Sequence, residues 1–536
     1  MKNHIEINNH GHFPYLGHGI HFHEELFGLK FDALLVQKTS DFIWSNDSTL
    51  PKFTCKPLPG KFSVISELAQ NMTVHLNGNK GLIGKFELFK EVERLDPSLM
   101  DGFIEIVKNH IIDPSKQSSN LIADFRCWSS WLANGIKIEP IFNGEKRANS
   151  FIPWPLAGIL LLSSKILGQQ PEFEYAADYV LRSGILPEGD VNTLSNSKQR
   201  IEYIRSIKPI VAFHDFDSNE QGFRMTHLAM EETSRKLLSN ANKAIIKDQF
   251  TTDLLKKMQE ALYQSNQLFN CMWDVSNPEL YNKEVRIFIQ GLNGNQGSIY
   301  DENGLFFENC GNDSSATYNS KGLFISNLHG QTGANSSYYP LADEITGIGN
   351  HTKAYIYDEK IDPIIIEKIL LSGYVKNSDL PEHFKIDSLS KLLKSFRVGY
   401  RPPSHHKLIV NIRNQIQNSS FEKQIQSDNE KKKALANCIR WIIQHRIDHY
   451  SMVVSYILKS PDPYSTQTKN RGTGGSPTPS FLPSIFIQTI ERLNDLVENN
   501  DEQWVKDILS ITDNHQESMN TFIEIAKKSS RKERLS

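Results

Sequence analysis

Residues 431–459 read KKKALANCIRWIIQHRIDHYSMVVSYILK and carry the clearest helical signal in the chain. Apolar residues recur there at spacings of three and four, which places them along one stripe of an α-helix. The stripe comprises Leu435, Cys438, Ile442, His449, Met452, Val453 and Tyr456. The spacing therefore predicts a long amphipathic helix that turns His449 towards the interior.

An inward histidine has two explanations. A lone histidine on an apolar face is more often a core residue hydrogen-bonded to a neighbour than a ligand. Arg446, however, lies one turn before His449 on nearly the same face. Burying a guanidinium is costly unless an anion meets it, so we expect a carboxylate of the chain or of a cofactor beside Arg446.

The same helical spacing recurs elsewhere and predicts a mainly α fold. Further helices are expected at 223–247, 252–273, 362–372 and 481–498, and loops at 291–297, 330–337 and 466–479. A chain of 536 residues exceeds what one hydrophobic core usually fills. Because the first part is richer in Pro, His and isolated aromatics, we expect a smaller N-terminal domain over 1–208 and a helical domain over 209–536.

The composition excludes several classes of partner. Lys and Arg number 59 against 62 Asp and Glu, a net charge of -3, so neither nucleic acid nor an anionic membrane is an expected partner. The most apolar stretch, 151–162, contains Pro153 and Pro155 and is too short to span a bilayer. No secretory signal is apparent at the N-terminus, so a cytoplasmic location is expected. The sequence makes no prediction of the oligomeric state.

Cysteines and N-terminal histidines are the candidates for disulfide or metal sites. Cys55, Cys127, Cys271, Cys310 and Cys438 form no CxxC pair, which predicts reduced thiols packed as small hydrophobic residues. Five histidines cluster near the N-terminus: His10, His12, His18, His21 and His23. Such a tract is either a metal module of its own or an unstructured terminus, and the second explanation is the commoner.

The helix around His449 is followed by a glycine-rich segment, G-T-G-G-S at 472–476. Composition alone fits a flexible linker as well as a ligand loop. Together, R-x-x-H-x-x-x-V-x-x-Y-I at 446–457 and this segment resemble the proximal helix and substrate-covering loop of the indoleamine 2,3-dioxygenase family. Three further segments occur in the family's order: V-R-I-F-I-Q-G-L-N-G-N at 285–295, G-Q-T-G-A-N-S-S at 330–337 and R-P-P-S-H at 401–405. The resemblance covers roughly 174–497.

The resemblance implies a b-type haem whose iron is bound by His449. Arg446 would lie near the haem propionates and pair with Asp343, which follows the second of these segments. Thr332, with Gln331, matches a loop over the distal face of the haem.

The resemblance also implies how a substrate is held. Arg286 matches the arginine that grips the substrate carboxylate, a task suited to a bidentate guanidinium; its alternative is an ordinary surface arginine at a helix end. Thr473 matches the residue that contacts the amino-acid head group once the loop closes.

The segment F-x-x-x-H-x-A-x-E at 223–231 departs from that family and looks like tryptophan 2,3-dioxygenase instead. In that sister family the histidine, here His227, hydrogen-bonds the indole N–H; the alternative is a half-exposed helical histidine with no role. Phe223, Tyr281 and Tyr179 would surround a flat substrate, although such aromatics are often plain core.

Two other departures concern the substrate. Leu292 replaces the usual Trp of its motif, and Arg224 stands where both families place an apolar residue. Arg224 either extends to solvent or meets a second anionic group on a substrate other than plain tryptophan.

These residues together predict a haem-dependent dioxygenase that inserts dioxygen into an aromatic amino acid. Conversion of L-tryptophan to N-formylkynurenine, the entry to tryptophan catabolism by the kynurenine pathway, is the first choice. One alternative is a haem-dependent aromatic oxygenase or peroxygenase of secondary metabolism. Another, of a different class, is a non-catalytic haem-binding or haem-sensing protein.

Overall fold

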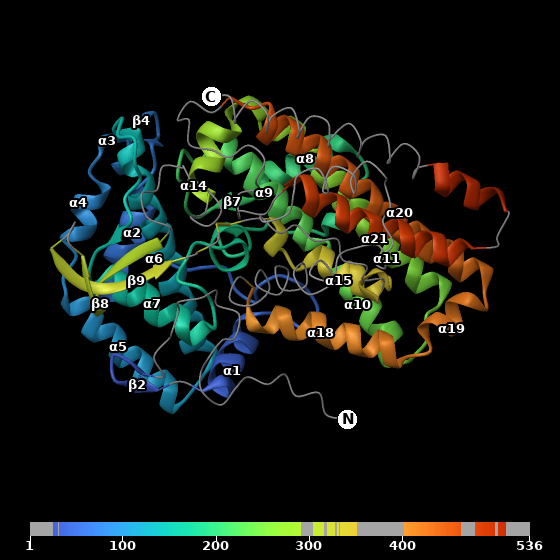
Figure 1. Cartoon of the computed structure of the whole chain (residues 1–536), viewed down its shortest axis with the longest axis horizontal. Coiled ribbons are helices and arrows are strands. Elements are labelled where there is room, and N and C mark those ends of the chain that lie inside the picture. The colour runs from blue at the N-terminus through green and yellow to red at the C-terminus, as the bar shows by residue number, and fades with distance from the viewer. Residues whose placement is uncertain are drawn as a thin grey trace, which may run out of the picture.

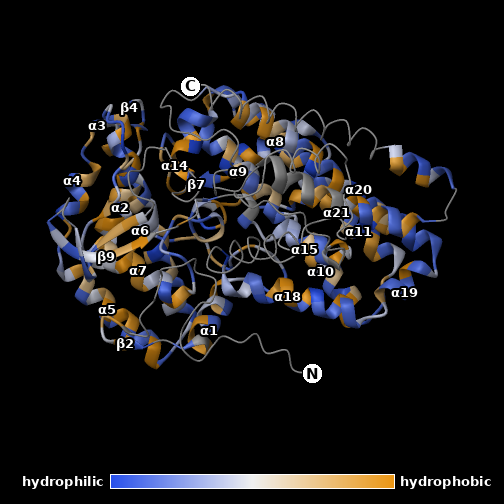
Figure 2. Cartoon of the chain, viewed as in Figure 1, coloured by the Kyte–Doolittle hydropathy of each residue, from blue (hydrophilic) through white to orange (hydrophobic). Residues whose placement is uncertain are grey.

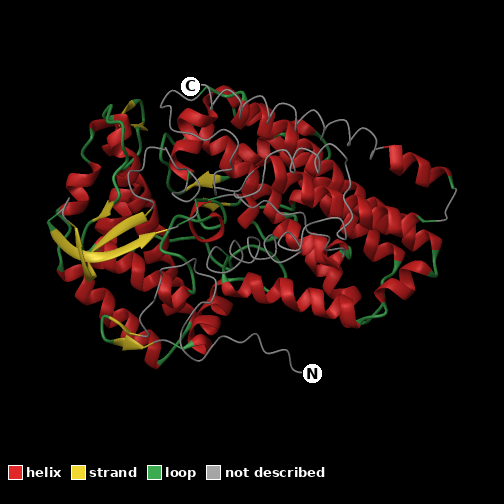
Figure 3. Cartoon of the chain, viewed as in Figure 1, coloured by secondary structure: helices red, strands yellow, loops and turns green. Residues whose placement is uncertain are grey.

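The computed structural model describes residues 25–30, 32–290, 304–315, 319–326, 328, 330–331, 333–350, 401–461, 478–498 and 502–510. Helices dominate this part of the chain, and the strands are short apart from one hairpin (Figure 1, Figure 3). The predicted mainly α fold class is confirmed.

The N-terminal lobe is built around one buried helix, α6 (Lys116–Phe142). Ser115 caps its N-terminus, where its side chain accepts a hydrogen bond from the Ser118 N–H in a capping box. Around it lie α1 (Ala33–Ile43), η1 (Gly60–Phe62), α2 (Ser63–Asn71), α3 (Leu82–Lys85), α4 (Leu88–Glu93), α5 (Ser98–Ile112) and α7 (Leu156–Leu167). The α7 helix is mostly hydrophobic (Figure 2), and all of its residues are buried inside this lobe.

Because α6 is buried on all sides, its charged residues need internal partners. Lys137 pairs with Glu172 at 2.7 Å, and Arg126 pairs with Asp178 at 2.5 Å. These pairs join α6 to η2 (Tyr175–Tyr179), a single π-helical turn that contains Asp178, and to Glu172 just before it. The same turn places Tyr179 in the core.

The helical lobe occupies the other side of the molecule (Figure 1). Its elements are η3 (Val191–Thr193), α8 (Ser197–Ser206), α9 (Asn219–Glu232), α10 (Ser234–Ile246), α11 (Thr252–Asn270), α12 (Met272–Val275), α13 (Pro278–Tyr281), η4 (Asn282–Arg286), α14 (Ile287–Ile289), η5 (Gly333–Asn335), α15 (Tyr338–Ile345), η6 (Ile348–Asn350), α18 (Pro403–Asn418), α19 (Phe421–Gln426), α20 (Asn429–Met452), η9 (Val453–Leu458) and α21 (Thr478–Val497). The long helix α20 packs between α11 and α21.

Four of the five predicted helices are present, with corrections to their bounds. The helix predicted at 223–247 is divided into α9 and α10 at Thr233, whose hydroxyl donates back to the Met230 carbonyl. The helix predicted at 252–273 ends at Asn270 and continues as the separate turn α12, and that predicted at 431–459 changes to π-helix at Val453. The helix predicted at 362–372 lies outside the described residues.

The strands connect the two halves of the sequence. β8 (Gly304–Ser315) and β9 (Ser320–Ser326) form an antiparallel hairpin, and β5 (Phe151–Ile152) pairs with β8 in parallel. The remaining strands form two-residue pairs: β1 (Glu25–Leu26) with β2 (Leu29–Lys30), β3 (His75–Leu76) with β4 (Asn79–Lys80), and β6 (Gly184–Ile185) with β7 (Lys208–Pro209). The hairpin from the second half of the chain thus completes the N-terminal lobe.

Two buried hydrophobic clusters form the core. One runs from Leu29 to Phe486, and the second lies within 237–508. The first cluster draws residues from both sides of position 208, so the hydrophobic core does not divide there. The division into two domains at residue 208 stays a prediction.

All five cysteines are buried and unbridged, as predicted from their spacing. Among the described helices, not one combines the length and the apolar character that crossing a bilayer requires.

Candidate functional site

His449 lies near the C-terminal end of α20 and faces Phe269 of α11. The two ring centroids are 6.2 Å apart, and the imidazole makes no hydrogen bond to any part of the chain that the structure describes. Burial lowers the pKa of His449 to about 4, an effect to which the nearby His227 adds. The predicted inward direction is confirmed, and the imidazole is neutral at physiological pH, the form that binds a metal.

The anion that was expected beside the buried Arg446 is the carboxylate of Asp343. Its Nη2 donates to both carboxylate oxygens of Asp343 at 2.8 and 2.7 Å, and its Nη1 donates to the Ile485 carbonyl at 2.8 Å. The expected pairing with Asp343 is therefore present. It joins three helices, since Asp343 belongs to α15 and Ile485 to α21.

A second histidine of α20, His445, was not singled out from the sequence. Its ring lies parallel to that of His449 at 6.2 Å and stacks on Tyr339 at 3.8 Å. Its Nδ1 is buried and has no hydrogen-bond partner in the described chain. The separation of four residues from His449 was the available signal, because residues four apart share one helix face.

His227 lies on α9 and, like His449, lies beside the ring of Phe269. Its ring centroid is 6.5 Å from that of Phe269 and 4.6 Å from that of Phe223. Nδ1 donates to the Phe223 carbonyl at 2.8 Å, and burial lowers the pKa of His227 to about 4. With its proton on Nδ1, the neutral ring presents Nε2 as a hydrogen-bond acceptor.

Arg286 ends the π-helical turn η4 and is completely buried, so the surface-arginine alternative is wrong. Burial raises the pKa of Tyr281, and the positive charge of Arg286 opposes that rise, which places the guanidinium near the Tyr281 hydroxyl. Tyr281 in turn packs on Phe223 at 5.0 Å and on Tyr456 at 5.4 Å. An aromatic wall therefore runs between His227 and Arg286.

Arg224 is also completely buried, so the expectation that it extends to solvent is wrong. Its Nη1 lies 3.6 Å from a carboxylate oxygen of Glu220, and its Nη2 donates to the Val211 carbonyl and, at 2.7 Å, to Gln221. The guanidinium lies over the ring of Tyr179 at 5.6 Å. The anion that Arg224 requires is thus supplied by its own helix.

No role was predicted for Glu231, one turn after His227, but its carboxylate links several distant segments through hydrogen bonds. Its completely buried carboxylate accepts hydrogen bonds from Thr49 at 2.5 Å, from Tyr175 at 3.2 Å and from Ser336. Arg401 donates to the Ser336 carbonyl at 2.8 Å. Segments 223–231 and 330–337 therefore meet at this carboxylate, and segment 401–405 joins them through the Ser336 carbonyl.

Several predicted residues lie outside the described part of the chain. These are Thr332, Thr473, Leu292, and the histidines at positions 10, 12, 18, 21 and 23. Within the described ranges, no three His, Cys, Asp or Glu side chains are grouped so as to hold a metal ion.

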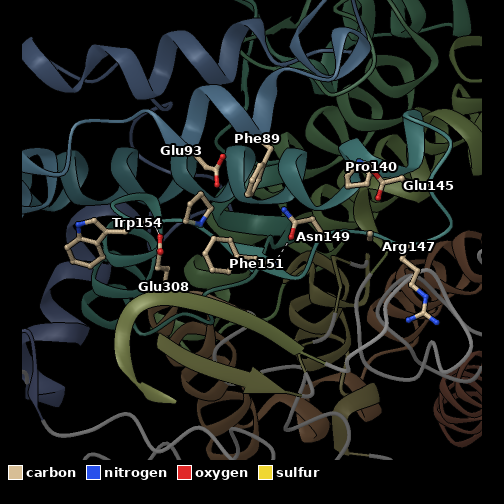
Figure 4. A pocket seen from close by; sticks show the side chains of 11 residues that line it. Phe89, Glu93, Pro140, Glu145, Arg147, Asn149, Phe151, Trp154 and Glu308 are labelled. Atoms are coloured by element: carbon tan, nitrogen blue, oxygen red, sulfur yellow. Dashed lines mark hydrogen bonds between the residues drawn. The ribbon is translucent and has the colours of Figure 1, made fainter. Parts of the chain in front are cut away.

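A surface cavity of about 610 Å³ lies elsewhere, among α4, the end of α6, and the strands β5 and β8 (Figure 4). Phe89, Phe151 and Trp154 line it, and Glu308 accepts a hydrogen bond from the Trp154 N–H at 2.9 Å. No predicted site residue contributes to its lining, so it is separate from the histidines.

Comparison with known proteins identifies one matching family model. The model described as indoleamine 2,3-dioxygenase matches residues 138–492, a range that includes His227, Arg286 and His449. No curated protein matches the chain. The match begins earlier in the chain than the motifs alone indicated, inside the central helix α6.

Proposed function

Since the chain belongs to the indoleamine 2,3-dioxygenase family, we propose that it is a haem-dependent dioxygenase of L-tryptophan or a related indole amino acid, with N-formylkynurenine as product. Family membership supports the haem and the reaction class. The substrate, the product, the kynurenine pathway and a cytoplasmic location are the finer part of the proposal.

One observation carries the proposal at the level of residues. Two neutral histidines, His227 and His449, come from different helices and both lie beside the ring of Phe269, at 6.5 and 6.2 Å. One has no hydrogen bond within the described chain and is free to bind a metal. The other keeps a fixed acceptor nitrogen. These properties suit a cofactor beside His449 and a substrate beside His227.

The residues present fit a haem. His449 would bind the iron, and Arg446 with Asp343 would lie on the propionate side, where a guanidinium favours carboxylates. When bound, the haem supplies the oxygen chemistry, and the protein supplies orientation and electrostatics.

The substrate would be held by three contacts. Nε2 of His227 accepts a hydrogen bond from the indole N–H, and Arg286 binds the carboxylate as a bidentate donor. Thr473 is proposed to contact the head group when its loop closes, and Thr332 is proposed to lie over the distal face of the haem. Phe223, Tyr281 and Tyr179 would flank the ring. Fixing the ring in one orientation lowers the entropic part of the barrier.

Turnover tests the reaction. Purified ferrous protein with haem, dioxygen and L-tryptophan is expected to form N-formylkynurenine, followed by its absorbance and by mass. Oxygen consumption without that product would point to another aromatic substrate. Retained haem with no oxygen consumption for any indole or phenol would instead favour a haem sensor.

Haem content tests the iron ligand. His449→Ala is expected to lose the haem Soret band, because the iron loses its protein ligand. His445→Ala is the matched control, one turn away on the same face, and is expected to keep it. A full haem complement in the His449 variant would refute the assignment.

A further inference from the structure

Asp448, the residue directly before His449 on α20, is surrounded by amide groups. Its Oδ2 accepts hydrogen bonds from the side-chain amides of Asn266 and Asn270, both at 2.9 Å, and its Oδ1 accepts one from that of Gln444 at 3.0 Å. Within the described residues no lysine or arginine pairs with this carboxylate. Hydrogen bonds to a charged acceptor are the stronger kind, and Asp448 makes three of them.

Two of these partners belong to another helix. Asn266 and Asn270 lie four residues apart on α11, so they share one face of that helix. Gln444 lies four residues before Asp448 and shares a face of α20 with it in the same way. The carboxylate therefore fastens one turn of α20 to one turn of α11, and we call these four side chains the amide clamp.

The turn of α11 that the clamp holds carries Phe269, between the two asparagines. The Phe269 ring lies 6.2 Å from the ring of His449 and 4.6 Å from that of His445, both on α20, and 6.5 Å from that of His227 on α9. His449 makes no hydrogen bond to the described chain, so its direction depends on how α20 is placed against α11. The clamp acts at the level of the helices where this placement matters.

A neutral side chain could not take the place of Asp448 in the clamp. An asparagine there would keep one acceptor oxygen and replace the other by an N–H donor that faces amide donors. Asn266 is completely buried, so its amide has no water to turn to. A buried donor that loses its acceptor costs free energy, and most of all where the acceptor was charged.

We propose that Asp448 is a positioning residue for the proposed iron ligand: through the amide clamp it fixes the turn of α20 that carries His449 against Phe269 of α11. The inference rests on the proposed function for the role of His449 and adds the residue that directs its imidazole. The clamp is distinct from the Arg446–Asp343 pair, which joins α20 to α15.

An exchange of two partners gives the sharpest test. Asp448→Asn is expected to raise the hydrogen-exchange rates of the backbone amides of residues 445–452 by about tenfold, the value of one hydrogen bond. Adding Asn270→Asp gives the new amide a carboxylate partner and restores the net charge, so the rates should return close to those of the wild type. Asn270→Asp alone sets two carboxylates against each other and should raise the rates again.

The iron–histidine stretching band of the ferrous, haem-loaded protein reports on His449 itself. In Asp448→Asn this band is expected to shift or broaden, and in the double variant it should return to its wild-type position. Asp253→Asn makes the same chemical change in an exposed pair at the start of α11 and is the control. It should alter neither the band nor the exchange rates of residues 445–452.

The outcomes separate this inference from the proposed function. Unchanged exchange in Asp448→Asn, or no recovery in the double variant, would overturn the clamp. Faster exchange with an unchanged band would show that Asp448 stabilises α20 without directing His449, which also overturns the proposal. Neither readout needs turnover, so a protein that retains haem but converts no indole would end the dioxygenase proposal alone. If the wild type binds no haem, the proposed function fails, and exchange in the haem-free protein decides whether the clamp fixes α20.

Discussion

His227 is held in one tautomer by its own helix, and this determines what it can recognise. Because Nδ1 donates to the Phe223 carbonyl, Nε2 is left as an acceptor, and an imidazole with a pKa of about 4 stays neutral. Such a nitrogen accepts an N–H and has nothing to offer a methylated ring nitrogen. The proposed recognition of the indole N–H would therefore depend on a backbone contact inside α9.

The first prediction tests this contact. His227→Ala is expected to lower kcat/KM for L-tryptophan by up to about tenfold, the value of one hydrogen bond. The wild type should discriminate against the indole-N-methyl analogue, and the variant should not. Steady-state kinetics with both compounds measures this, and equal discrimination by the two proteins would remove the role of His227.

Arg286 allows a similar test of the proposed contact with the substrate carboxylate. Arg286→Ala is expected to raise the KM for L-tryptophan roughly ten- to hundredfold, because a hydrogen bond to a charged group is among the stronger ones. Tryptamine, which lacks the carboxylate, is the control substrate, and its KM should be the same in both proteins. A KM for L-tryptophan that does not change would contradict the carboxylate contact.

At the level of elements, the Arg446–Asp343 pair fastens α20 to α15, and the Ile485 carbonyl extends the contact to α21. The two side chains are only 9 % and 21 % exposed. Removing one charge of a mostly buried pair leaves the other poorly compensated. The pair therefore positions the helix that carries His449.

Asp343→Asn is accordingly expected to lower the free energy of unfolding by about 2 kcal/mol and to weaken haem retention. Asp253→Asn makes the same change in an exposed pair with Lys257 and should cost less than about 1 kcal/mol. Urea unfolding and haem titration of both variants measure the difference. Equal losses of unfolding free energy and of haem retention in the two variants would show that the Arg446–Asp343 pair contributes no more than an exposed pair.

Gly222 permits the close approach of α9 to the end of α12. A Cβ atom at this position would lie 1.7 Å from the Val275 carbonyl oxygen, which belongs to the backbone and cannot move aside alone. Gly102, in α5, is the contrasting case, since its Cβ would meet only the side chains of Lys61 and Phe62, at 3.0 Å and beyond.

Gly222→Ala is therefore expected to destabilise the protein by more than about 1 kcal/mol, because α9 must shift. Gly102→Ala is expected to be neutral or to stabilise it slightly, since alanine is the better helix former. Thermal unfolding of the two variants makes the comparison. A Gly222 variant as stable as the wild type would show that the contact relaxes at little cost.

Buried neutral histidines give the whole molecule a characteristic response to acid. Burial lowers the pKa of His110 and of His214 to about 4, and that of His405 to about 3. In the unfolded chain these groups titrate near a pKa of about 6.5. Between the two values the unfolded state binds more protons than the folded state, so stability falls as the pH falls.

The free energy of unfolding is expected to be greatest above about pH 6.5 and to decrease as the pH falls towards 4. His110→Gln should make this decrease shallower, because it removes one of the titrating groups. Urea unfolding across this pH range measures both proteins. A stability that rises on acidification, or an unchanged slope in the variant, would contradict the assignment.

Much of the architecture and part of the site could be read from local sequence. The spacing within 431–459 predicted α20 and the inward direction of His449, and the buried charge of Arg446 required an anion. The scattered cysteines indicated free thiols. These features are properties of residues close together in the chain, where helix geometry alone fixes which side chains share a face.

Other features were decided only by the packing of distant segments. Glu231 meets Thr49 across 182 positions of sequence, and the β8–β9 hairpin joins β5 of the other lobe. The burial of Arg224 beside Trp131 and Tyr179, which excluded the solvent-exposed arginine, is of the same kind. Helical periodicity specifies which face of a helix is buried, but not which other element covers it. The identity of that covering element, and with it the partner of each buried polar group, exists only in the folded chain.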